Sequence, residues 1–129
     1  MDRHRRSKIL AVDDDEAVLD VAVEILRSAG YEVVGVTNAC RALEVIAETP
    51  EIDLLFTDIV MPGELHGFAL AEKARQLRPD LPIVYASGYC DFFDRRSLAA
   101  PSGPFIPKPY RPRSLLSEIA RALWASPRP

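Results

Sequence analysis

The sequence predicts an α/β protein in which helices cover both faces of a doubly wound parallel sheet. Short apolar runs alternate five times with amphipathic helical patterns, which is typical of strands joined by crossover helices. The first, third and fourth runs are apolar almost throughout, as in strands covered on both faces. Five such units in 129 residues are too few for an eight-unit barrel, so we expect one open sheet.

Each element follows from its apolar pattern and its turn residues. Strands are expected where apolar residues run together, at residues 8–12, 31–36, 52–57, 82–87 and 105–107. Helices are expected where apolar residues recur every three or four positions, at 16–29, between Asn38 and Pro50, and at 68–77, 91–99 and 112–124. Gly30 takes the place of a glycine after a helix, Asn38 can cap the second helix, and Pro112 fits the first turn of the last.

Two helices are expected to bury defined faces. The first should bury Val18, Ala22, Ile25 and Ala29, with Leu19, Val23 and Leu26 beside them. The last should bury a stripe of Leu116, Ile119, Ala120 and Leu123. Trp124 is interpreted as a core residue or a dimer contact.

Composition and charge exclude several classes of protein. The chain is 48% hydrophobic with a net charge of −3, which suits one folded domain and gives no basic field for nucleic acid. Its apolar runs are too short for a membrane span or a signal peptide. We expect a cytoplasmic domain at residues 8–125, between a basic N-terminal tail (1–7) and a C-terminal tail (126–129). Cys40 and Cys90 have no CxxC spacing and are expected to be reduced and packed.

Polar residues gather where the predicted strands end. Asp13, Asp14, Asp15 and Glu16 follow the first strand, Asp58 follows the third, Ser87 ends the fourth and Lys108 follows the fifth. In such sheets ligands bind beyond the carboxyl ends of the strands. Grouped carboxylates repel one another unless a cation binds, and their oxygens suit Mg²⁺. A lysine and a hydroxyl are expected around a phosphoryl group, and an aspartate can itself form an aspartyl phosphate.

Each of these residues also has a structural interpretation. Asp15 and Glu16 fit the start of the first helix, where negative charge is favoured. Asp58 could be a turn residue, Ser87 a hydroxyl at a strand end and Lys108 a solvated lysine. Their convergence on one edge of the sheet favours the site.

Four motifs at these strand ends resemble the receiver domain of two-component response regulators, the CheY-like superfamily. They are ILAVDDDE at residues 9–16, LLFTDIVMPG at 54–63, IVYASG at 83–88 and FIPKPY at 105–110. The likeness covers about residues 8–124. It implies a flavodoxin/CheY-like (βα)5 fold with strand order 2-1-3-4-5.

The resemblance implies a role for each matching residue. Asp58 falls on the phosphoacceptor, and Asp13, Asp14, Asp58 and the backbone carbonyl of Val60 fall on the Mg²⁺ ligands. Ser87 and Lys108 fall on the residues that contact the phosphoryl group, Ser87 and Phe105 on the switch pair, and Pro109 on a proline that commonly follows a cis peptide bond. The loop at 61–67 is one residue longer than the family's usual form. Val60 and Tyr89 should flank the path of the hydrolytic water, where their bulk should slow loss of the phosphoryl group.

The implied function is phosphoryl acceptance on Asp58, with Mg²⁺, from a histidine kinase or a histidine phosphotransfer protein. Such a domain catalyses its own phosphorylation and dephosphorylation without being a conventional enzyme. Its output would pass through the face formed by residues 91–99, 105–107 and 112–124, to a downstream protein target or a second copy in a homodimer. No direct contact with nucleic acid or membrane is expected.

Three alternatives to a stand-alone receiver remain open at this point. The chain could be a receiver cut from a hybrid histidine kinase. It could be a degenerate receiver that acts as an unphosphorylated binding module. The third alternative is an enzyme: Asp13 and Asp15 after an apolar strand also resemble the motif of haloacid-dehalogenase-like phosphatases, with Asp13 as nucleophile and Asp15 as acid and base.

Overall fold

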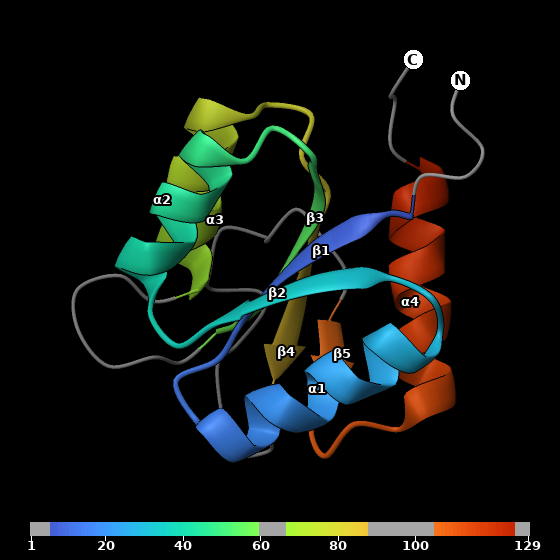
Figure 1. Cartoon of the computed structure of the whole chain (residues 1–129). Helices are drawn as coiled ribbons and strands as arrows, with labels where there is room; N and C mark the ends of the chain where they lie inside the picture. Colours follow the sequence, from blue (N-terminus) through green and yellow to red (C-terminus); the bar gives the residue numbers. More distant parts are fainter. Residues whose placement is uncertain (1–5, 60–66, 88–104, 126–129) are drawn as a thin grey trace, which may run out of the picture.

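A five-stranded parallel sheet forms the centre of the computed structural model, with strand order β2-β1-β3-β4-β5 (Figure 1). The strands are β1 (Lys8–Val12), β2 (Glu32–Val36), β3 (Ile52–Asp58), β4 (Ile83–Ser87) and β5 (Phe105–Pro107). The structure describes residues 6–59, 67–87 and 105–125. This order is the one that the family resemblance implied, and the strand bounds predicted from the sequence agree with the observed ones to within one residue.

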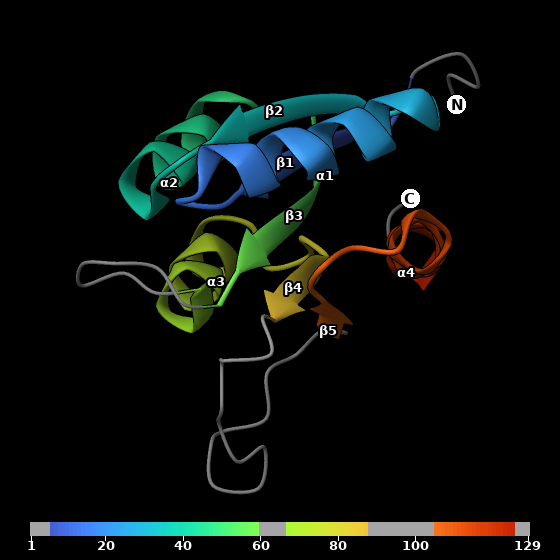
Figure 2. The same cartoon turned by 90° about the horizontal axis from the view of Figure 1, so that it is seen from below.

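Helices cover both faces of the sheet, as predicted. They are α1 (Glu16–Ser28), α2 (Ala39–Glu48), α3 (Gly67–Leu77) and α4 (Pro112–Ala125). Helices α2 and α3 lie on one face and α1 and α4 on the other (Figure 2). The helix expected at 91–99 lies outside the described residues. No helix in the described ranges is long and apolar enough to cross a membrane.

The alternation of side chains along β1 divides the core in two. Leu10 and Val12 pack toward α2 and α3, whereas Ile9 and Ala11 pack toward α1 and α4. All seven residues of β3, the central strand, are buried. Burial on both faces explains why these strands are continuous apolar runs instead of alternating ones.

Short-range hydrogen bonds set the ends of the first two helices. The Asp15 carboxylate accepts from the backbone N–H groups of Ala17 and Val18, and the Asn38 side chain accepts from that of Arg41. These contacts satisfy donors that a helix leaves unpaired at its first turn. Gly30 has φ of 99°, a left-handed conformation that favours glycine, and it follows the last turn of α1 as predicted.

The buried faces predicted for two helices were partly wrong. Helix α1 buries Leu19, Ala22 and Leu26, while Val18 and Ile25 are only partly buried and Ala29 is exposed. Helix α4 buries Leu115 and Ile119, so its buried stripe is displaced from the predicted one. In both cases the direction of packing against the sheet selects one face from a broad apolar surface.

Two single residues are also more exposed than expected. Trp124 is 88% exposed and is therefore not part of this domain's core. Cys40 is exposed, not packed, because Ala39 and Ala42 form the buried side of α2 around it. Cys90 lies outside the described residues.

Candidate functional site

The register of β1 and β3 brings two aspartates together at the carboxyl edge of the sheet. Val12 is paired with Thr57, so the residues that follow them, Asp13 and Asp58, lie at the same level. Asp58 is the last residue of β3, whereas the sequence predicted that this strand ends at Thr57. Both aspartates are buried, whereas Asp14 is exposed at the mouth of the site.

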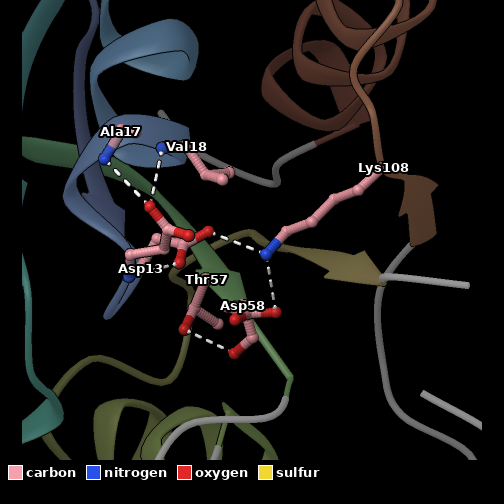
Figure 3. Close-up of polar contacts among 7 residues, drawn as sticks. Asp13, Ala17, Val18, Thr57, Asp58 and Lys108 are labelled. Atoms are coloured by element: carbon pink, nitrogen blue, oxygen red, sulfur yellow. Dashed lines mark hydrogen bonds and ion pairs between the residues drawn. The ribbon is translucent and has the colours of Figure 1, made fainter. Parts of the chain in front are cut away.

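Lys108 reaches across this edge to both buried carboxylates (Figure 3). Its Nζ lies 2.8 Å from Asp13 Oδ2 and 3.2 Å from Asp58 Oδ1. Burial lowers the pKa of Lys108, but the contacts with Asp13 and Asp58 outweigh burial and hold it above the ordinary value of 10.5. The side chain is therefore a permanent positive charge between two acids. The Lys108–Pro109 peptide bond is cis, as the resemblance implied.

Three carboxylates form a group that fits a divalent cation. Oxygen atoms of Asp13, Asp14 and Asp58 all lie within 4.8 Å of one another. Three negative charges against the one positive charge of Lys108 leave the site with a formal charge of −2. Carboxylate oxygens of this kind, with an exposed member that leaves room for water, match the preferences of Mg²⁺.

The three consecutive aspartates have different surroundings. Asp13 faces Lys108, and its Oδ1 also accepts from the backbone N–H of Asp15. Asp15 caps α1 and is not a member of the carboxylate group. The interpretation of Asp15 as a cap of the first helix is thus confirmed. In the phosphatase alternative Asp15 would be the acid and base, but its carboxylate is occupied by these capping hydrogen bonds.

The sequence did not single out two residues that lie near Asp58. The Thr57 hydroxyl donates to the backbone carbonyl of Asp58 at 3.0 Å (Figure 3). Tyr110 packs on Phe56 with ring centroids 5.6 Å apart, and burial together with the charges of Asp13 and Asp58 raises its pKa well above the ordinary range. A hydroxyl residue inside an otherwise apolar strand, directly before Asp58, was the available signal for Thr57.

The structure describes only part of the pair of residues, Ser87 and Phe105, that was expected to act as a switch. Phe105 is partly buried and stacks on Tyr85 at 5.4 Å, and Phe68 of α3 meets both rings edge-on. Ser87 is the last residue of β4 and is paired with Pro107 of β5. Its side chain, like Val60 and Tyr89, lies outside the described parts, so the roles expected of these residues stay predictions.

Comparison with known proteins shows the family to which the chain belongs. The sequence pattern of the response regulator receiver domain matches residues 9–120. The chain is 36% identical to the response regulator receiver protein CpdR of Brucella abortus (strain 2308), over 92% of this chain and 98% of CpdR. A crystal structure of a CheY-like receiver domain protein from Methanospirillum hungatei JF-1 matches with a TM-score of 0.80 at 36% identity, over 92% of this chain and 94% of that one.

Similar domains also occur inside longer proteins. The chain is 34% identical to the sensor kinase CckA of Brucella abortus (strain 2308) over 89% of its own length, but it spans only 12% of CckA. The likeness therefore concerns one domain and not the activity of a whole kinase. Because the family's sequence pattern matches most of the chain and the strand order is the one that the resemblance implied, the chain belongs to the response regulator receiver domain family.

Proposed function

We propose that this receiver domain accepts a phosphoryl group on Asp58. One observation carries the proposal: a buried carboxylate at the end of β3 lies 3.2 Å from a lysine that stays protonated, beside a second and a third carboxylate. Burial limits competition from water, and the nearby positive charge can offset charge on a transferring group. Of the three carboxylates, Asp58 is the one at the end of the central strand β3, which pairs with β1 on one side and with β4 on the other.

The proposed reaction is an attack by the Asp58 carboxylate on phosphorus. A bond between a carboxylate oxygen and phosphorus forms as the bond from phosphorus to the donor nitrogen of a phosphohistidine, or to the oxygen of an acyl phosphate, breaks. The electron pair leaves with the donor. Lys108 remains protonated and stabilises the negative phosphoryl oxygens, so its contribution is electrostatic and not acid catalysis.

Asp13, Asp14 and Asp58 are the side chains that would hold Mg²⁺, together with the backbone carbonyl of Val60. When bound, the ion would neutralise negative charge on the carboxylates and on the phosphoryl oxygens. Asp13 also fixes the position of the Lys108 ammonium group at 2.8 Å.

The partners follow from the reaction and from the aromatic contacts near β5. The donor is a histidine kinase or a histidine phosphotransfer protein, and the output partner is a protein. A phosphoryl group on Asp58 would attract Ser87 and Lys108 and change the packing of Phe105, which lies beside Tyr85 and Phe68. The face that includes β5 and α4 would then present the change, to a downstream target or to a second copy.

The test is phosphorylation by acetyl phosphate with Mg²⁺, followed by intact mass. Wild type should gain one phosphoryl group, Asp58→Asn should gain none, and removal of Mg²⁺ by a chelator should prevent the gain. Asp80→Asn, an equal change at an exposed aspartate before β4, is the control and should behave as wild type. A phosphoryl group that persists in Asp58→Asn but not in Asp13→Asn would support the phosphatase alternative instead.

A further inference from the structure

The peptide group that follows the proposed acceptor is bound at both of its ends. Its carbonyl, that of Asp58, accepts from the Thr57 hydroxyl at 3.0 Å. Its N–H, that of Ile59, donates to the carbonyl of Ala86 on β4 at 3.2 Å. The second bond continues the sheet ladder, but the first is made by a side chain that is fully buried. A peptide group held in this way cannot rotate without the loss of a buried hydrogen bond.

The first residue of α3 packs against the same peptide group. A Cβ atom at Gly67 would overlap the Asp58 carbonyl oxygen and would lie 2.7 Å from Ile59 Cα. Gly67 also donates its N–H to the Ile59 carbonyl at 2.8 Å. Glycine is therefore needed here for close approach, since its φ is not in the left-handed region. The start of α3 thus packs tightly against the Asp58–Ile59 peptide.

We propose that Thr57 is a positioning residue for phosphoryl acceptance. Its hydroxyl, with Gly67 packed against the same peptide group, fixes the peptide after Asp58 and thereby the direction of the Asp58 carboxylate toward Lys108. The backbone dihedral angles of Asp58 determine where its Cβ and carboxylate lie, and small displacements of reacting groups cost rate. This inference rests on the proposed function of Asp58.

Paired substitutions separate the hydroxyl from the bulk of the side chain. Thr57→Val keeps the shape and the preference for a strand but removes the donor. Thr57→Ser keeps the donor and removes a methyl group. Thr37→Val, the same change just after β2 at the same sheet edge, is the matched control.

Two readouts are needed besides stability. The first is the initial rate of phosphorylation by acetyl phosphate at saturating Mg²⁺, per folded molecule as judged by circular dichroism. The second is the dissociation constant of Mg²⁺ by calorimetry without donor. Thr57→Val should phosphorylate about three- to tenfold more slowly, from the loss of one buried hydrogen bond, and bind Mg²⁺ more weakly. Thr57→Ser and Thr37→Val should stay within about twofold of wild type on both measures.

The outcomes distinguish this inference from the proposed function. If Thr57→Val matches wild type in rate and Mg²⁺ affinity, or if Thr57→Ser is as slow as Thr57→Val, the hydroxyl does not position the acceptor. If urea unfolding shows a loss of stability in Thr57→Val while rate and affinity are unchanged, the role is structural and the inference fails. A wild-type chain that is never phosphorylated would overturn both proposals.

Discussion

Replacing Lys108 with methionine tests the electrostatics of the site through stability alone. The ammonium lies 2.8 Å and 3.2 Å from two carboxylates whose side chains are 4% and 6% exposed, and is itself 19% exposed. With an effective dielectric constant of about 20, these contacts attract by about 6 and about 5 kcal/mol. Desolvation offsets most of this attraction, and removal of one partner from a buried pair costs about 3–5 kcal/mol. Since Asp14 leaves the site open to water on one side, we expect a loss of about 3 kcal/mol in Lys108→Met.

The assay is urea unfolding in the presence of a chelator, repeated with saturating Mg²⁺. Lys73→Met, an equal change at an exposed lysine of α3, should have little effect. Mg²⁺ should reduce the loss in Lys108→Met, because a cation held by Asp13, Asp14 and Asp58 offsets the same negative charge. A stability equal to that of wild type in the chelator, or a loss that Mg²⁺ does not reduce, would refute this reasoning.

Three further predictions concern pH, a helix cap and a close approach. The pKa of Lys108 is raised above 10.5 in the folded state, so its positive charge stabilises the fold fully at neutral pH and is lost only when the pH rises past that value. As the pH is raised from neutral, the stability gap between wild type and Lys108→Met should therefore stay constant up to pH 10.5 and narrow above it; a gap that is absent at neutral pH would contradict this. Asp15→Ala should lower the free energy of unfolding in urea by about 1 kcal/mol, because the cap of α1 is lost. Its Mg²⁺ affinity, measured by calorimetry, should not change; weaker Mg²⁺ binding would mean that Asp15 belongs to the metal site. Gly67→Ala should lower the free energy of unfolding by about 1–3 kcal/mol, because the new methyl group would overlap backbone atoms. Gly35→Ala should lower it less, because its methyl group would meet only side chains, the nearest being that of Val23 at 3.2 Å. Equal losses in thermal or urea unfolding would show that Gly67 does not pack tightly against the backbone.

The fold could be predicted because its signals are local and repeated. Apolar runs ended by acids or turn residues mark all five strands, and Asn38 and Gly30 mark helix ends through contacts a few residues away. The faces that α1 and α4 bury could not be predicted as well. Leu115, Leu116 and Leu123 are equally apolar in sequence, and only the position of α4 against the sheet decides that Leu115 is fully buried.

The candidate site likewise contains residues that the sequence could predict and contacts that it could not. Asp13, Asp58 and Lys108 were found because parallel strands bring their carboxyl ends to one edge, and the structure places the three side chains in contact. The sequence could not decide whether Asp15 caps the first helix or binds the metal, since an aspartate after a strand and before a helix suits both roles. The contacts of Thr57 and Gly67 with the Asp58 backbone depend on a junction of β3 and α3 that sequence periodicity does not describe.

The central claim is that Asp58 carries the phosphoryl group, and borohydride reduction tests it most directly. Reduction converts an aspartyl phosphate to homoserine, which peptide mass spectrometry then locates in the chain. After treatment of wild type with acetyl phosphate and Mg²⁺, we predict homoserine at position 58 and unchanged aspartate at positions 13 and 14. Homoserine at Asp13 or Asp14, or unmodified Asp58 in a protein that has gained a phosphoryl group, would contradict the account.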